Sequence, residues 1–172
     1  MDRLSAMDTG FFDIENSGPP VAVGTALTIE GKAPTVAKLR KHIESRLISM
    51  PRFRQKFEPS RSKILRGKWV DAVPDLTFHV SQRKIKSEPE FDAVVGEAIE
   101  AKMDPARPLW DAVMVTGYSA TEWKLLIRLH HAIADGQGAT ILLGQLFDFD
   151  PTGQVRLADG IAAMVTPRES DP

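Results

Sequence analysis

The 172-residue chain contains no cysteine. This absence excludes a thiol nucleophile, a disulfide framework and any metal site built on thiolates. It agrees with a reducing compartment, so we expect a cytoplasmic protein. No apolar run approaches the ~18 residues that a membrane-spanning helix needs, and the first eight residues lack the basic leader and apolar core of a secretory signal. Any contact with a membrane or a lipid droplet is therefore expected to be peripheral.

The chain also has little net charge, at −1, and no recognised nucleic-acid-binding motif, so we expect no nucleic-acid partner. Its length and apolar content suit one domain with one core. One region departs from this balance, because the seven basic residues between Arg52 and Lys68 are opposed only by Glu58. This cluster predicts either a site for a nucleotide phosphate or an anionic lipid surface, or simply a solvated hairpin.

The strongest chemical signal is His130-His131-Ala132-Ile133-Ala134-Asp135-Gly136, which directly follows an apolar run predicted to be a buried strand. An imidazole titrates near neutrality, so it can take a proton from an alcohol and return it to a leaving thiolate. Strand alternation puts His131 in phase with the apolar residues and His130 in phase with Arg128. We therefore expect the two rings to face opposite ways, with His131 as the general base and His130 in support.

The residues after the histidines predict a strand-to-helix turn. Asp135 either caps the following helix or pairs with an arginine, while Gly136 and Gly138 leave the backbone open to an acyl group or its oxyanion. A rival interpretation has His131 and Asp135 sharing a metal at i,i+4 spacing. No further ligand cluster completes a coordination shell in the sequence, so we expect no metal.

Periodicity and turn signals predict an α/β chain. We expect helices over 35–50, from the capping-box pattern at 87–90 to its end at Asp104-Pro105, and over 139–147. Strands are expected over 21–30, 52–57, 64–70, 76–80, 109–116 and 123–130. The last two strands are expected to pair as an antiparallel hairpin, which places Pro108, Leu109 and Trp110 beside the histidines. His42 is expected to be solvated on its helix, and His79 to mark the polar face of its strand.

The histidine segment resembles the HHxxxDG signature of the CoA-dependent acyltransferase superfamily, which includes chloramphenicol acetyltransferase-like enzymes and peptide-synthetase condensation domains. More narrowly, the chain is similar to bacterial wax ester synthase/diacylglycerol acyltransferases. That similarity is carried by residues 4–12, 51–57, 69–70, 79–80 and 107–110. The resemblance implies one half of a chloramphenicol acetyltransferase-like α/β fold, a mixed sheet flanked by helices, with the active site in a tunnel between two similar halves.

The resemblance also implies roles and partners. His131 would be the general base, Asp135 a structural residue, and Pro108 to Trp110 the family's Pro-Leu-Trp element. Residues 1–150 would form the N-terminal domain and 151–172 the start of an interdomain linker. The C-terminal domain with its Asn-Asp motif would be absent, since the only asparagine is Asn16.

The activity so implied is transfer of an acyl group from acyl-CoA, a co-substrate rather than a bound cofactor, to the hydroxyl of diacylglycerol or a long-chain alcohol. We expect this half to be inactive alone and to bind the complementary half. Two other interpretations stay open. One is a condensation-type or polyketide-associated acyltransferase that takes its acyl group from a carrier protein. The other is a non-catalytic interaction module that keeps the fold.

Overall fold

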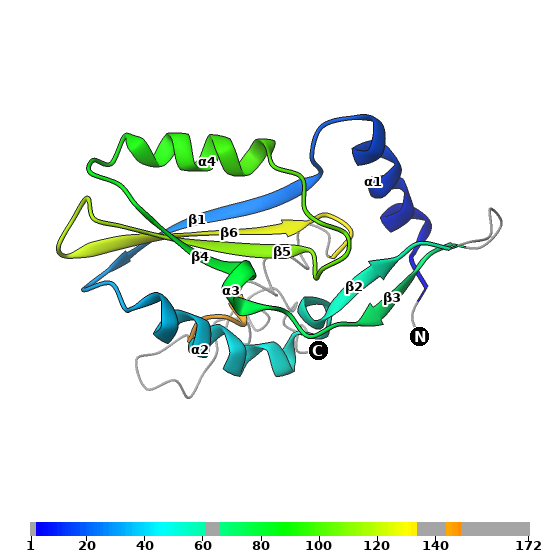
Figure 1. The fold of residues 1–172 in the computed structure, drawn as a ribbon, viewed down its shortest axis with the longest axis horizontal. Coiled ribbons are helices and arrows are strands. Elements are labelled where there is room, and N and C mark those ends of the chain that lie inside the picture. The colour runs from blue at the N-terminus through cyan, green and yellow to red at the C-terminus, as the bar shows by residue number, and fades with distance from the viewer. Residues whose placement is uncertain (1–2, 61–65, 134–143, 149–172) are drawn as a thin grey trace, which may run out of the picture.

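A computed structural model describes residues 3–60, 66–133 and 144–148 of the chain. Its main feature is a four-stranded mixed sheet in the order β1-β6-β5-β4, beside which stands a separate two-stranded sheet, β2-β3 (Figure 1). The helices and strands, with two short 3-10 helices labelled η, are α1 (Ala6–Ser17), β1 (Ala22–Glu30), α2 (Val36–Arg46), η1 (Leu47–Ser49), η2 (Pro51–Arg54), β2 (Gln55–Glu58), β3 (Lys68–Asp71), α3 (Leu76–His79), β4 (Val80–Lys84), α4 (Glu90–Glu100), β5 (Trp110–Thr116) and β6 (Glu122–His130).

The strand directions follow from the connections. β6 pairs antiparallel with both β1 and β5, so the predicted hairpin of the last two strands is confirmed. β4 pairs parallel with β5, and α4 lies in the connection between them. Two parallel strands need such a crossover because the end of the first strand and the start of the second lie at opposite ends of the strands.

Helices cover both faces of the sheet, with α4 on one side and α2 on the other (Figure 1). The side chains of β6 alternate accordingly, since Leu125 and Ile127 belong to the core cluster that includes α2, whereas Leu126 packs in a second cluster with Val94 of α4. This two-sided burial makes β6 an almost continuously buried strand. Its C-terminal end, where the histidines begin, is therefore held from both faces.

Local caps set several helix starts. The Thr35 hydroxyl accepts a hydrogen bond from the Lys38 backbone N–H, which confirms the predicted cap of α2. At α1, Ser5 and Asp8 form a reciprocal capping box, each side chain bonding the other residue's backbone N–H. The sequence patterns had assigned no element to α1, although residues 4–12 carry part of the family resemblance.

The prediction of a strand over 76–80 is wrong. Leu76–His79 forms the short helix α3, and strand β4 begins only at Val80. The Asp75 carboxylate accepts from both the backbone N–H and the hydroxyl of Thr77, which favours a helical turn over an extended strand. The exposure is consequently reversed: Phe78 is 51% exposed, whereas His79 is 1% exposed.

Candidate active site

The Pro-Leu-Trp segment and the paired histidines lie on adjacent strands, as predicted. The His130 backbone N–H donates to the carbonyl oxygen of Leu109 at 3.0 Å, and the Trp110 N–H donates to that of Pro108 at 3.0 Å. The Pro-Leu-Trp segment therefore fixes the main chain at the point where the histidine motif begins. This backbone contact joins two motifs that are 20 residues apart in the sequence.

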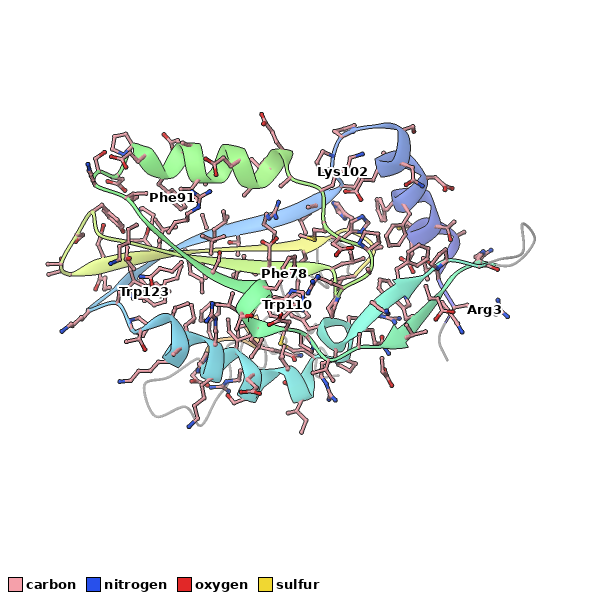
Figure 2. All side chains as sticks on the ribbon, viewed as in Figure 1. Arg3, Phe78, Phe91, Lys102, Trp110 and Trp123 are labelled. Carbon is pink, nitrogen blue, oxygen red and sulfur yellow. The ribbon has the colours of Figure 1, made fainter. Side chains whose placement is uncertain are left out.

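Trp110, labelled in Figure 2, is buried and contacts His79 of α3 and Phe53 of η2. Its indole N–H donates to the Phe53 carbonyl oxygen at 2.9 Å. The ring of His79 stacks on the indole with centroids 4.6 Å apart, and His79 Nδ1 lies 2.7 Å from the Trp110 carbonyl oxygen. Because a carbonyl only accepts, Nδ1 carries the proton in this contact. The tryptophan of the segment is thus held through both its side chain and its main chain.

His79 is therefore buried against Trp110, whereas we expected it to mark the polar face of a strand. Burial lowers the pKa of His79, and the bond to Trp110 opposes part of this effect. The expectation for His42 is also wrong, since its ring is half-buried and Nε2 lies 2.7 Å from the Leu146 carbonyl oxygen. Both histidines contact residues far away in the sequence, which strand or helix periodicity alone does not reveal.

His130 is completely buried, and both of its ring nitrogens face defined groups. Nδ1 accepts a 3.0 Å hydrogen bond from the Ala132 backbone N–H, and Nε2 lies 3.4 Å from Glu15 Oε2. The ring also stacks on Phe12 at 4.7 Å. Burial lowers the pKa of His130, while the Glu15 carboxylate opposes that effect. A neutral imidazole with Nδ1 already accepting has no lone pair left to take a proton from substrate.

His131 has a different environment. It lies in the turn after β6, with its backbone N–H donating to the Val21 carbonyl oxygen at 3.0 Å. Its half-buried ring stacks on Phe11 at 4.8 Å. His131 Nδ1 is buried and has no hydrogen-bond partner in the described part of the chain. His130 Nε2 likewise makes no hydrogen bond within that part of the chain, although it faces Glu15. The two histidines therefore differ at Nδ1, which accepts a hydrogen bond in His130 and none in His131.

The expectation that the two rings face opposite ways rested on strand alternation continuing through His131. β6 ends at His130, so the alternation does not extend to the next residue. Both rings instead stack on neighbouring phenylalanines of α1, Phe11 and Phe12. No sequence pattern predicted that α1 packs against the histidines, although Phe11 and Phe12 lie within the segment that carries the family resemblance.

Asp135, Gly136 and Gly138 lie outside the described residues, so their proposed roles stay predictions. The same holds for the helix expected over 139–147, of which only the end is described, and for the linker over 151–172. Among the described residues, no group of three or more His, Cys, Asp or Glu side chains is arranged to hold a metal ion. No helix in that part of the chain combines the length and apolar composition needed to cross a membrane.

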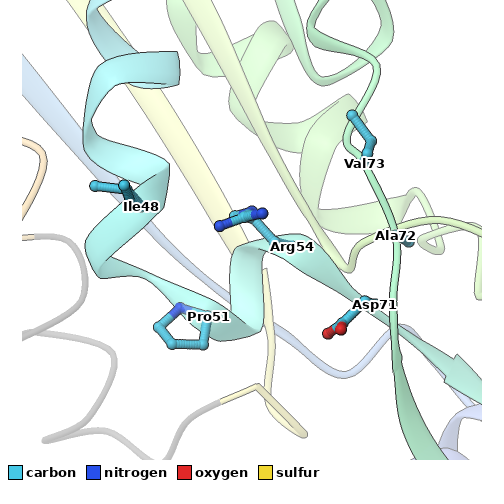
Figure 3. A pocket seen from close by; sticks show the side chains of 6 residues that line it. All are labelled: Ile48, Pro51, Arg54, Asp71, Ala72 and Val73. Atoms are coloured by element: carbon cyan, nitrogen blue, oxygen red, sulfur yellow. The ribbon is translucent and has the colours of Figure 1, made fainter.

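The described residues of the basic cluster lie around η2 and the paired strands β2 and β3. Arg52 lies over the Trp69 ring and bonds Gln55, and Lys68 pairs with Glu58 at 3.3 Å. Arg54 lines an open surface pocket of about 290 Å³ (Figure 3), whose walls are Ile48, Pro51, Arg54, Asp71, Ala72 and Val73. None of the candidate site residues lines this pocket. Binding of a phosphate or a lipid surface by this cluster stays a prediction.

Solved structures define the fold class. A wax ester synthase/diacylglycerol acyltransferase from Marinobacter aquaeolei VT8 superposes with a TM-score of 0.70 over 87% of this chain and 39% of that one, at 20% identity. A variant of the starter condensation domain of rhizomide synthetase RzmA, in complex with C8-CoA, gives 0.67 over 84% of this chain and 34% of that one, at 16% identity. The fold is thus one half of the chloramphenicol acetyltransferase-like architecture, as the resemblance implied.

Sequence comparison identifies the family. Residues 4–164 match the wax ester synthase/diacylglycerol acyltransferase catalytic domain, and the chain belongs to this acyltransferase family. Two Mycobacterium tuberculosis H37Rv proteins named as diacylglycerol O-acyltransferases, Rv3371 and tgs1, are each 31% identical over 154 residues. These matches cover 86% of this chain and 33% of each relative. The chain therefore spans about a third of the length of these curated relatives.

Proposed function

We propose that this chain supplies the histidine-bearing half of an O-acyltransferase. The enzyme would move a fatty acyl group from acyl-CoA to the hydroxyl of diacylglycerol or a long-chain alcohol. The observation that carries this proposal is the contrast between the two Nδ1 atoms: that of His130 accepts the Ala132 backbone N–H, whereas that of His131 has no hydrogen-bond partner among the described residues. The names of the relatives and the C8-CoA complex of a structural neighbour support the choice of substrates.

In this mechanism His131 acts as the general base. Its neutral imidazole takes the proton of the acceptor hydroxyl while that oxygen attacks the thioester carbonyl carbon. The tetrahedral intermediate then collapses, the carbon–sulfur bond breaks, and the imidazolium returns the proton to the coenzyme A sulfur. The products are the ester and free coenzyme A, and the base is regenerated. General-base assistance of this kind is worth about 10²–10⁴ in rate.

The remaining rate enhancement would come from positioning and oxyanion stabilisation. The bonds from the His130 and His131 backbones to Leu109 and Val21 hold the base against the residues that directly precede β5 and β1. We further propose that backbone N–H groups near Gly136 and Gly138 donate to the oxyanion and that Asp135 holds the turn. A chain of about a third of its relatives' length is expected to need the complementary domain for activity.

A second candidate is acyl transfer from a carrier protein, as in condensation domains. The structural similarity to the starter condensation domain favours it. The acyl donor separates the two candidates, because a carrier-dependent enzyme should use free acyl-CoA poorly. The sequence identity to diacylglycerol O-acyltransferases, 31% against 16% for the condensation domain, favours the first.

The test is a thiol-release assay on the chain assembled with its complementary domain. Palmitoyl-CoA is supplied with diacylglycerol or hexadecanol, and lipid products are separated to identify the acceptor. We expect His131→Ala to reduce kcat about 10²–10⁴-fold. The matched control is His42→Ala, which removes an imidazole elsewhere on the chain. Turnover that survives in His131→Ala at the control's level would dismiss the base assignment.

A further inference from the structure

Glu15, near the end of α1, contacts the residue before β1 and the last residue of β6. Its Oε1 atom accepts a 3.0 Å hydrogen bond from the Val21 backbone N–H, just before β1, and its Oε2 atom lies 3.4 Å from His130 Nε2. The side chain is only 12% exposed. A carboxylate is rarely buried to this extent unless it is paired. No sequence motif had indicated this residue.

The contact with Val21 reaches the candidate base directly. The Val21 carbonyl oxygen accepts the 3.0 Å hydrogen bond of the His131 backbone N–H. Val21 therefore bonds Glu15 through its N–H group and His131 through its carbonyl oxygen. The position of Val21, which Glu15 restrains, in turn restrains the His131 backbone. A displacement of Val21 would move the backbone from which the His131 imidazole extends.

The contact with His130 fixes the protonation of that ring. Because His130 Nδ1 accepts from the Ala132 N–H, the neutral ring carries its proton on Nε2, the atom that faces the Glu15 carboxylate. At 3.4 Å this is an electrostatic contact rather than a short hydrogen bond. The carboxylate nevertheless favours this tautomer, and with it the bond that holds Ala132, the residue after His131.

Lys102, in the segment after α4, donates through Nζ to the main-chain carbonyl of Glu15 and ties the end of α1 to that segment (Figure 2). Among the residues that the structure describes, the other ionisable group acting on His130 is the His131 ring, which lowers the His130 pKa, whereas Glu15 raises it. The Glu15 carboxylate is therefore the group that offsets the burial of His130.

We propose that Glu15 is a positioning residue for the candidate base: it sets the His130 tautomer and, through Val21, the backbone position of His131. This assignment rests on the proposed function of His131. A carboxylate suits the role because its two oxygens accept from two donors at once. A glutamine in its place has one acceptor oxygen and satisfies only one of them.

The first test needs no activity. Histidine ring nitrogens and the Val21 amide are followed by NMR in ¹⁵N-labelled chain, with Glu15→Gln compared against Asp13→Asn, a loss of charge at an exposed position of the same helix. In Glu15→Gln we expect the pKa of His130 to fall further and the Val21 amide signal to move, and in Glu15→Ala the Nε2–H tautomer of His130 to lose population. Should Glu15→Ala not fold, the same-sized glutamine variant carries the test. His130 and Val21 signals that respond equally to Asp13→Asn and Glu15→Gln would overturn the proposal.

The second test uses the assembled enzyme. Glu15→Gln should lower kcat about 10- to 100-fold, as expected for a misplaced catalytic group, with little change in the KM for palmitoyl-CoA. Glu15→Asp, which retains the charge, should restore part of the loss. A KM effect alone, or an unchanged kcat, would also overturn it. If His131→Ala retained full activity while the NMR changes occurred, the proposed function would fail and the Glu15 contacts would stand.

Discussion

The backbone N–H of His130 donates a 3.0 Å hydrogen bond to the carbonyl oxygen of Leu109. This bond makes the Pro-Leu-Trp segment a structural neighbour of the histidine pair. Trp110 is the residue after Leu109. A substitution that makes Trp110 more mobile is therefore expected to displace Leu109 and, through this hydrogen bond, the backbone of His130. Trp110 itself is held by the Phe53 carbonyl oxygen and by His79.

Replacing Trp110 by phenylalanine should destabilise the chain by about 1–3 kcal/mol, because it leaves the buried Phe53 carbonyl without its donor. The matched control is Trp69→Phe. Trp69 is equally buried, but its indole nitrogen has no hydrogen-bond partner among the described residues, so removing it breaks no bond that the structure shows. Urea unfolding of both variants gives the comparison. A Trp69→Phe loss as large as that of Trp110→Phe would show that lost packing, and not the hydrogen bond, sets the cost.

Acid should destabilise the fold as the pH falls below about 6.5, the ordinary pKa of histidine. Burial lowers the pKa of both His79 and His130 in the folded chain. Below pH 6.5 the unfolded chain therefore binds protons that the folded chain does not, and the free energy of unfolding falls until the pH passes the folded-state values. Above pH 6.5 this contribution to stability is fully present.

The substitution His79→Asn separates the contribution of His79 to this pH dependence from that of His130. An asparagine amide can still donate to the Trp110 carbonyl oxygen in place of Nδ1–H, but it does not titrate. Urea unfolding between pH 8 and pH 5 should show a shallower pH dependence for the variant than for the wild type, with the curves compared relative to their values at pH 8. Parallel curves would mean that His79 takes no part in the acid response.

Arg128 ties the end of α4 to β6, two residues before His130. It pairs with Asp111, with Nε 2.9 Å from Oδ1, and donates to the carbonyl oxygens of Ala98 and Ala101. Lysine cannot form this planar set of bonds, so Arg128→Lys should reduce hydrogen-exchange protection near the C-terminal end of α4. Arg83→Lys, in an exposed pair with Glu97, is the control and should change protection little. Equal effects of the two variants would contradict the role given to Arg128.

The sequence predicted what local periodicity determines. The β5-β6 hairpin, the cap at Thr35 and the adjacency of Pro108–Trp110 to the histidines are all confirmed. These features depend on strand alternation, turn residues and side-chain caps, which act over a few residues. The family resemblance supplied the rest of the fold, because periodicity does not specify that β4 pairs parallel with β5.

The contacts around the histidines could not be predicted in the same way. Glu15 and His130 are 115 positions apart, and nothing in either local pattern indicates that they meet. His79 was assigned to the wrong face because the Asp75 cap turns the preceding residues into a helix. The choice between His130 and His131 was predicted from strand phase, but the contacts that support it are the partners of their ring nitrogens.

The two stacked phenylalanines of α1 should separate stability from activity. Phe12 is buried and stacks on both Phe57 and His130, at 4.2 and 4.7 Å, so Phe12→Leu loses two aromatic contacts and about 1–3 kcal/mol of stability. Phe11 is half-buried and, among the described residues, stacks on His131 alone, so Phe11→Leu should cost about 0.5–1.5 kcal/mol.

In the assembled enzyme the effect on turnover should lie with Phe11. Its ring limits the orientations of the His131 imidazole, and a smaller, flexible leucine releases that restraint, which should lower kcat about tenfold. Thiol release at saturating palmitoyl-CoA, measured well below the unfolding midpoint of each variant, separates turnover from folding. If Phe11→Leu unfolds more readily than Phe12→Leu yet turns over normally, Phe11 is a packing residue and the His131 ring is oriented by other contacts.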